Sequence, residues 1–292
     1  MFSLDSKVAI VTGGGSGIGR SISERLATAG ACVLLTGRNE AELEETTATI
    51  RHAGGTAAWR VTDITASGSG EETVAAAVAD FGRLDILVNN AGSADPADIG
   101  PLIDIREDQW DRVVNLNLKA NFFMAQAAAR QLRRQTLAVA GLEGRFGDKL
   151  EGGRRGGAII QISSRSGSQP NPMTGHYGAS KAGIENLVAT MAVEWGHLNI
   201  RVNAIAPGVV VTDANRDFMS GPRAQKQIET VPLGRLGKPD DIAALCVYLA
   251  SDEADWVSGS VIQVTGGSRL PMGYLAYLHK IQKASREDAR DG

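Results

Sequence analysis

Three polar side chains in the sequence could together form a proton-transfer site. Tyr177 and Lys181 are four residues apart in a stretch whose pattern turns helical from about Thr174, so they are expected to share one helix face. A tyrosine hydroxyl has a reference pKa of about 10, and an ammonium group one turn away stabilises the phenolate and lowers that pKa. Ser164 ends an apolar, β-branched run and can offer a hydroxyl to the same substrate oxygen. These residues predict general acid–base catalysis at a substrate oxygen.

Strands and helices are expected to alternate along the chain, which would bring such residues together. This alternation favours a parallel sheet with helices on both faces, in which ligands bind beyond the carboxyl ends of the strands. The predicted fold class is α/β, a single Rossmann-like, doubly wound domain of about seven parallel strands over residues 1–269. The expected strands are residues 7–12, 31–36, 56–61, 85–88, 158–162, 200–205 and 260–264.

A glycine-rich turn lies between the first expected strand and a helix that runs to about Ala29. Glycines allow a tight turn and a close approach of the backbone to a pyrophosphate, and the helix N-terminus favours its negative charge. The intervals differ from the common dinucleotide fingerprint, which has two residues between its last two glycines. The residues predicted to hold the cofactor here are Gly13, Ser16, Gly17, Ile18 and Gly19.

The ends of the second and third expected strands indicate which dinucleotide is bound. The residue that meets the adenosine ribose is expected about 20 residues past the glycines, where an acidic side chain would bind the 2′-hydroxyl of NAD. This chain has Arg38 there, which suits a 2′-phosphate, although a solvated arginine before a helix is the alternative. Asp63 can accept from an adenine amino group, and Ile64 follows it.

A long helix is expected from about residue 107 to near residue 134, with Asn117 at its centre. An asparagine inside a helix is unfavourable unless its side chain has a partner. Asn117 is therefore a candidate for a polar contact in the active site. Asn115 is interpreted as a capping or packing neighbour.

Composition narrows the classes of function. The 292 residues carry a net charge of −3, which does not suggest a nucleic-acid or anionic-membrane partner. No apolar run approaches the ~18 residues of a transmembrane span, and no signal peptide is recognised, so a cytoplasmic protein is expected. The histidines show no metal-ligand spacing, and Cys32 and Cys246 are interpreted as buried thiols.

Three segments lack a clear function in the sequence. Residues 135–157 are rich in glycine and arginine and are expected to form a mobile surface insertion. Residues 213–230 are polar and without clear periodicity, and they could cover the cofactor as a lid. Residues 270–292 form a C-terminal extension.

Taken in order, these motifs resemble the short-chain dehydrogenase/reductase family over roughly residues 7–267. The run Thr12 to Gly19 is similar to that family's glycine motif, and residues 89–92 (Asn-Asn-Ala-Gly) to its strand-four signature. Tyr177 and Lys181, with Ser164 before them, resemble its catalytic core, which Asn117 completes. The resemblance implies further cofactor contacts at Asn90, Ala91, Gly92, Pro207, Gly208, Val210 and Thr212.

The resemblance implies an NAD(P)-dependent oxidoreductase that interconverts a small-molecule carbonyl and an alcohol. Tyr177 would transfer the proton, Ser164 would bind the same oxygen, and Lys181 would serve both the tyrosine and the nicotinamide ribose. Asn117 would hold a water that links Lys181 to solvent. NADP is expected, with NAD less favoured. A homotetramer is expected and a homodimer is possible, with the contact surface formed by Phe122, Phe123, Ala127, Ala128, Ile184, Leu187 and Val188.

Two departures and several alternatives stay open at this point. The interval from Asn117 to Tyr177 is longer than the family usually shows, and Thr265 stands where an aspartate is common. A catalytically silent dinucleotide-binding regulator or scaffold would keep the fold without turnover. A lyase or epimerase would use the same pair of residues, and an NAD-dependent alcohol dehydrogenase would differ only in its cofactor. The substrate is not indicated.

Overall fold

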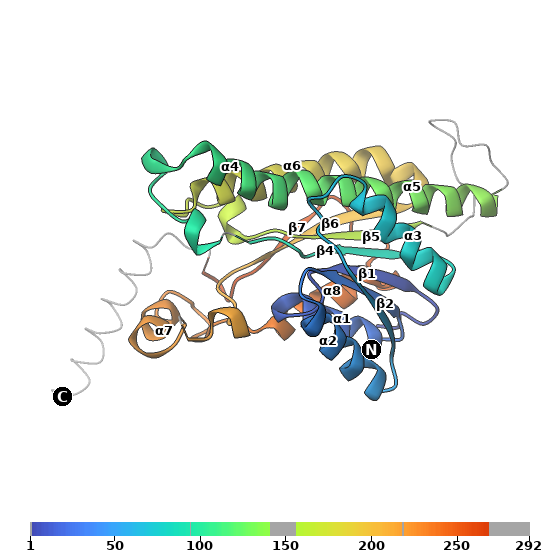
Figure 1. The fold of residues 1–292 in the computed structure, drawn as a ribbon, viewed down its shortest axis with the longest axis horizontal. Helices are drawn as coiled ribbons and strands as arrows, with labels where there is room; N and C mark the ends of the chain where they lie inside the picture. Colours follow the sequence, from blue (N-terminus) through green and yellow to red (C-terminus); the bar gives the residue numbers. More distant parts are fainter. Residues whose placement is uncertain (1, 94, 141–155, 218, 269–292) are drawn as a thin grey trace, which may run out of the picture.

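The computed structural model describes residues 2–268 except residues 94, 141–155 and 218. In this part of the chain, seven parallel strands form one sheet in the order β3-β2-β1-β4-β5-β6-β7 (Figure 1). The strands are β1 (Val8–Thr12), β2 (Cys32–Gly37), β3 (Thr56–Val61), β4 (Ile86–Asn89), β5 (Gly157–Ile162), β6 (Ile200–Pro207) and β7 (Val261–Val264). The predicted doubly wound α/β fold is confirmed.

Helices cover both faces of the sheet (Figure 1). One face carries α1 (Gly17–Thr28), α2 (Glu40–His52) and α8 (Pro239–Ala250), and the other carries α3 (Ser69–Phe81), α5 (Asn121–Ala140) and α6 (Gly175–Trp195). Helix α4 (Glu107–Val114) precedes α5, and α7 (Gly221–Ile228) lies beyond the carboxyl end of the sheet. Short 3₁₀ turns are η1 (Pro96–Asp98), η2 (Leu102–Asp104), η4 (Arg165–Gly167), η5 (Gly196–Leu198), η6 (Asp213–Asn215) and η7 (Asp252–Ala254).

The central strands bury both of their faces, whereas β3 and β7 at the two edges of the sheet are only partly buried. Ile10 and Leu34 point into the layer under α3, α5 and α6, whereas their neighbours Val11 and Leu35 point into the layer under α1, α2 and α8. Successive strand side chains alternate between faces, so two covered faces require an unbroken apolar run. This explains why β1, β4 and β5 read as continuous apolar segments in the sequence.

The helix expected over residues 107–134 is not regular. A π-helical segment, η3 (Asn115–Ala120), joins α4 to α5, and α5 continues to Ala140. The Asn121 amide donates to the Leu116 carbonyl at 2.9 Å and to the Asn117 carbonyl at 3.3 Å, so side chains here take part in the main-chain hydrogen bonding. Such π segments often occur at functional sites.

Two further expectations need correction. Residues 135–140 belong to α5, so the expected insertion cannot begin at residue 135, and the part at residues 141–155 lies outside the described residues. Residues 213–230 are not irregular, because η6 and α7 occupy most of them. The extension at residues 270–292 also lies outside the described part of the chain.

Other expectations concern membranes, metals and cysteines. In the described part of the chain, no helix is both long and apolar enough to cross a membrane. The same residues contain no group of three or more histidine, cysteine or acidic side chains placed to hold a metal ion. Both cysteines are free; Cys246 is fully buried, as expected, but Cys32 is only partly buried.

Candidate active site

The carboxyl ends of the strands bring the predicted catalytic residues together. Ser164 follows β5, Tyr177 and Lys181 project from the first two turns of α6, and Asn117 comes from the π-helical segment. The side chains of Ser164 and Tyr177 are hydrogen-bonded to each other. The Lys181 Nζ lies 5.6 Å from the centre of the Tyr177 ring. A hydroxyl pair with an ammonium beside it can hold and move a proton at one substrate oxygen.

Lys181 is buried, with 4% of its surface exposed, and its Nζ donates to the Ile162 carbonyl at 2.8 Å. Burial lowers the pKa of Lys181 to about 8, and the negative charge of Glu185 acts in the opposite direction. Burial disfavours the charged form of an amine, whereas a nearby carboxylate favours it. The ammonium therefore loses its proton much closer to neutral pH than an exposed lysine does.

The pKa of Tyr177 differs from the sequence-based expectation. Burial raises it, and the hydrogen bond with Ser164 lowers it by less. The expected lowering by Lys181 is not found, because the ammonium is directed at the Ile162 carbonyl and enclosure of the phenol disfavours the phenolate. At neutral pH, Tyr177 is therefore a phenol that can donate a proton.

Asn117 is fully buried. Its Nδ2 donates to the Ser93 carbonyl at 2.7 Å and to the Val113 carbonyl at 2.9 Å. Its Oδ1 has no hydrogen-bond partner among the described residues. A Cβ placed on Gly92 would lie 2.6 Å from this Oδ1 and 3.2 Å from the Lys181 Nζ, so both polar atoms border the space that Gly92 leaves open.

The glycine turn has the shape of a phosphate cradle. Gly13 adopts a φ of +63°, and a Cβ on Gly19 would lie 1.9 Å from the Gly13 carbonyl oxygen, so no larger residue fits at position 19. Ser16 and Ile18 flank Gly17 at the start of α1, whose N-terminus favours an anion. The Asn90 side chain donates to the carbonyls of Thr12 and Gly13, which ties the turn to the end of β4.

Thr12 begins the glycine motif in the sequence, but its contacts were not predicted. Its hydroxyl accepts from the backbone N–H groups of Asn90 and Ala91, both at 3.0 Å. Thr12 therefore fixes the distance between β1 and the Asn90–Gly92 segment, the two edges of the cofactor cleft. The available signal was a polar residue at the end of an otherwise apolar strand.

A cavity of about 680 Å³ lies at the predicted adenosine site beside β2 and β3. Arg38, Asp63 and Ile64 line it, together with Ala91 and Gly92. Hydrogen bonds from the backbone N–H and the hydroxyl of Thr65 hold the pKa of Asp63 below its usual range. An ionised carboxylate suits the predicted acceptor role toward an adenine amino group.

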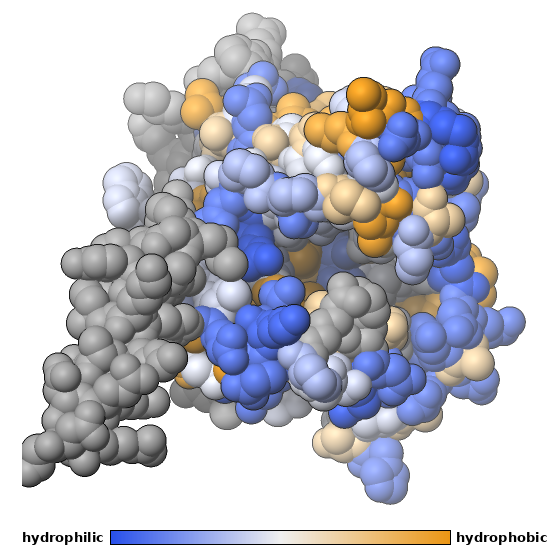
Figure 2. Space-filling view, turned by 90° about the vertical axis from the view of Figure 1, so that its left-hand side faces the viewer, coloured by the Kyte–Doolittle hydropathy of each residue, from blue (hydrophilic) through white to orange (hydrophobic). Residues whose placement is uncertain are grey.

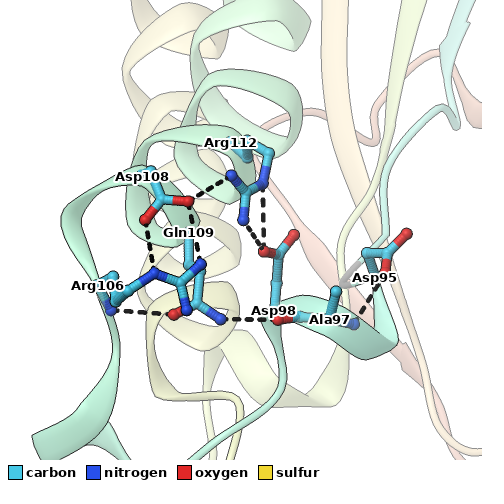
Figure 3. A network of polar contacts seen from close by, with 7 residues as sticks. All are labelled: Asp95, Ala97, Asp98, Arg106, Asp108, Gln109 and Arg112. Atoms are coloured by element: carbon cyan, nitrogen blue, oxygen red, sulfur yellow. Dashed lines mark hydrogen bonds and ion pairs between the residues drawn. The ribbon is translucent and has the colours of Figure 1, made fainter.

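Sequence reasoning missed a polar network (Figure 3), of which Asp98 and Arg112 line this cavity. Arg112 binds the carboxylates of the buried Asp98 and the exposed Asp108, each at 2.7 Å. Gln109 donates to the Ala97 carbonyl at 2.7 Å and accepts from the Arg106 N–H at 3.0 Å. The network fastens η1 to α4. Nothing in the sequence connects Asp98 with Arg112, because their pairing depends on the path of the intervening loop.

The segment after β6 packs against β7 and against the glycine turn. The Gly208 N–H donates to the Val264 carbonyl at 2.9 Å, and a Cβ on Gly208 would lie 2.9 Å from the Thr265 Cα. Thr212 lies against the glycine turn, since a Cβ on Gly17 would be 3.2 Å from its Cγ2. Pro207 ends β6, Val210 is buried, and Thr265 packs behind Gly208. The cofactor contacts expected at Pro207, Gly208, Val210 and Thr212 stay predictions.

The comparisons with known proteins agree with this architecture. A family model described as short chain dehydrogenase matches residues 7–222. The chain is 35% identical to the 7alpha-hydroxysteroid dehydrogenase of Escherichia coli (strain K12), over 90% of this chain and 94% of that one. It is 37% identical to the L-rhamnose 1-dehydrogenase (NAD(P)(+)) of Azotobacter vinelandii, over 90% and 97%. A solved 7 alpha-hydroxysteroid dehydrogenase complexed with NADH and 7-oxo glycochenodeoxycholic acid superposes with a TM-score of 0.80 at 34% identity, covering 91% and 95%.

Proposed function

The chain belongs to the short-chain dehydrogenase family and is an NAD(P)-dependent oxidoreductase, and we propose that Tyr177 is its general acid and base. The supporting observation is that Tyr177 is hydrogen-bonded to Ser164 and has the Lys181 ammonium beside its ring. In the reducing direction, Tyr177 donates its proton to the carbonyl oxygen of the substrate, and Ser164 stabilises the developing charge. The bound nicotinamide supplies or accepts the hydride.

The residues of the cleft fit a dinucleotide. Gly13 and Gly19 allow the tight turn before α1, because a Cβ at either position would meet Asn90 or the Gly13 carbonyl, and the ionised Asp63 offers an acceptor at the predicted adenosine end. We assign Lys181 to the nicotinamide ribose as well as to Tyr177. Asn117 is assigned the water that connects Lys181 with solvent, because its unpartnered Oδ1 borders the same space as the Lys181 Nζ.

We propose NADP as the preferred cofactor, with Arg38 as the residue that selects it. Arg38 is exposed, lines the adenosine cavity, and is placed after β2 where NAD-binding chains carry an acidic residue. A guanidinium binds a phosphate with charge-assisted hydrogen bonds. The competing proposal is NAD, since the solved hydroxysteroid dehydrogenase was complexed with NADH and the name of the rhamnose enzyme gives both cofactors.

An apolar rim at the substrate entrance supports a substrate with an apolar body. Leu102 lies against Gly175, two residues before Tyr177, and the Gly100 N–H donates to the Met173 carbonyl at 2.9 Å. Figure 2 faces this end of the molecule and shows hydrophobic surface gathered above a central hollow. The large apolar side chains exposed on these two loops are Ile99, Leu102, Ile103 and Met173.

The test of the proposed function is turnover by the purified protein. NADPH oxidation is measured with a panel of ketones and aldehydes of increasing apolar size, and alcohol oxidation is measured in the reverse direction. The expected result is turnover that disappears in Tyr177→Phe. A protein that binds NADPH but turns over no member of the panel in either direction would favour the catalytically silent reading.

We also propose a homotetramer, or otherwise a homodimer, built through α5 and α6. Part of the expected contact surface is wrong, because Ala127, Ala128, Ile184 and Val188 are buried in the core of the single chain. An open groove of about 560 Å³ between the same helices supports the proposal instead, lined by Phe122, Gln126, Leu187, Met191 and Trp195 among others. Cytoplasmic location stays a prediction from the sequence.

A further inference from the structure

Three side chains of helix α6 contact the residues at the end of β5. Two of them, Tyr177 and Lys181, belong to the proposed reaction, and the third is Glu185. Tyr177, Lys181 and Glu185 are spaced by four residues and so project from one helix face. Tyr177 is hydrogen-bonded to the Ser164 hydroxyl, and Lys181 donates to the Ile162 carbonyl. The third contact is made by Ser163, which lies between Ile162 and Ser164 in the sequence. The Ser163 hydroxyl donates to Glu185 Oε1 at 2.7 Å.

The carboxylate of Glu185 packs closely against Gly167 of η4. A Cβ on Gly167 would lie 2.5 Å from Glu185 Oε1, so the glycine of η4 leaves the room that this carboxylate fills. Ser163, its hydrogen-bond donor, is 3% exposed. A carboxylate held by an enclosed hydroxyl keeps one position, which a solvated side chain on a helix surface does not.

We propose that Glu185 is a positioning residue, whose Ser163-bound carboxylate is the fixed counter-charge that keeps the buried Lys181 ammonium charged and aligned beside Tyr177. This inference rests on the proposed catalytic role of Tyr177 and Lys181. It adds Ser163 and Glu185 to the residues that determine the reaction. Neither of them needs to touch substrate or cofactor.

The other charges around α6 do not replace this one. Of the described charged groups, Glu185 is the one whose charge acts on Lys181, against the effect of burial. Asp108 on α4 is already held by Arg106 and Arg112. The remaining titratable or charged side chains on the elements packed against α6 are His176 and Glu194 on α6 itself, His197 on η5, Arg165 on η4, Lys119 on η3, Glu107 and Asp111 on α4, Arg130, Arg133 and Arg134 on α5, and Arg201 on β6.

The experiment compares pH profiles of carbonyl reduction. Glu185→Gln keeps the shape of the side chain and an oxygen that accepts from Ser163, but it removes the charge. Without the carboxylate, the charged form of Lys181 is less stable relative to the neutral amine. The fall of kcat on the alkaline side should therefore begin at lower pH. We expect kcat to be several-fold lower than in the unmodified enzyme at pH 8 and less reduced at pH 6. The melting temperature should stay within about two degrees. Glu72→Gln, which removes an exposed carboxylate on α3, is the matched control and should leave the profile unchanged.

A profile of Glu185→Gln that superposes on that of the unmodified enzyme would overturn the proposal. A uniform loss of rate at all pH values with a lower melting temperature would also overturn it, because that is the result of a merely structural role. If Glu185→Gln does not fold, Ser163→Ala takes its place. It frees the carboxylate to move and should shift the limb in the same direction by less, and an unshifted limb counts against the proposal.

Tyr177→Phe, measured in parallel, separates this inference from the function on which it rests. An inactive Tyr177→Phe together with an unshifted Glu185→Gln profile rejects only the role of Glu185. A fully active Tyr177→Phe rejects the proposed catalytic assignment itself.

Discussion

The Lys181 Nζ lies 5.6 Å from the centre of the Tyr177 ring and donates its hydrogen bond to the Ile162 carbonyl, not to the phenol. The lysine ammonium therefore lies beside the phenol without binding it, and it takes no direct part in the hydrogen bond between Tyr177 and Ser164. Removing the phenol and removing the ammonium should consequently have different effects.

Tyr177→Phe should abolish turnover and leave cofactor affinity nearly unchanged, because only the transferable proton and one hydrogen bond are lost. Steady-state rates and the Kd for NADPH, measured on the same preparation, check this. Retention of more than about a tenth of the activity would contradict the proton-donor role.

Lys181→Met should lower the rate and weaken cofactor binding together, since one ammonium is assigned to the ribose and to Tyr177. Fluorescence titration with NADPH measures the binding, and single-turnover kinetics measure the chemical step. A loss of rate with unchanged Kd would remove the ribose contact from the assignment and keep the contact with Tyr177.

The same variant should change how stability depends on pH. The folded-state pKa of Lys181 is about 8, below the 10.5 of an ordinary lysine, so the unfolded chain binds more protons between these values and stability rises with pH there. Below about pH 8 the buried charge is destabilising, by up to about 3 kcal/mol for this shift. Lys181→Met removes it. Its gain in free energy of unfolding over the unmodified protein should be larger at pH 7 than at pH 10. Denaturant unfolding at both pH values measures this gain, and a gain that is the same at pH 7 and pH 10 would contradict the prediction.

Arg38→Ala should weaken NADPH by roughly tenfold or more and leave NADH little changed, because a charge-assisted contact to the 2′-phosphate contributes about 1.5–3 kcal/mol. The ratio of kcat/KM with the two cofactors is the readout. Ser16 is uncharged, so no second basic residue of the glycine turn would mask the loss. Equal efficiency of the unmodified enzyme with both cofactors would refute the NADP preference.

Light scattering at micromolar concentration should show an oligomer. Leu187→Lys places a charge at a partly buried position of the groove between α5 and α6 and should shift the protein toward smaller species. Val193→Lys, at an exposed position of α6 that is not among the residues lining the groove, serves as the control. A monomeric unmodified protein would end the assembly proposal.

The sheet and the catalytic residues could be predicted because both depend on short-range patterns. Unbroken apolar runs mark strands buried on both faces, and the residues that follow each run must lie at one edge of a parallel sheet. That reasoning placed Ser164 at this edge, the helical spacing paired Tyr177 with Lys181, and an asparagine inside a helix marked Asn117. The structure has these side chains near one another.

What could not be predicted depends on contacts between distant segments. Whether Ala127 and Val188 lie in the core or on a free surface is decided by how α5 and α6 pack on the sheet, not by their apolar character. The balance between burial and charge at Tyr177 requires the depth of the pocket, which no sequence spacing contains. The pairing of Asp98 with Arg112 depends on the course of a loop.

The π-helical segment between α4 and α5 changes the direction in which the side chains of α5 point relative to those of α4. A regular α-helix turns by about 100° per residue, so each residue accommodated in a wider π turn offsets everything beyond it by roughly that angle. The offset lets Asn117 face the catalytic cleft while Met124, Ala128 and Leu132 still face the sheet. Deleting one residue from the segment would restore a regular helix and rotate the whole of α5 about its axis. The deletion would therefore change the packing of α5 on the sheet along the whole helix, far from the deleted residue.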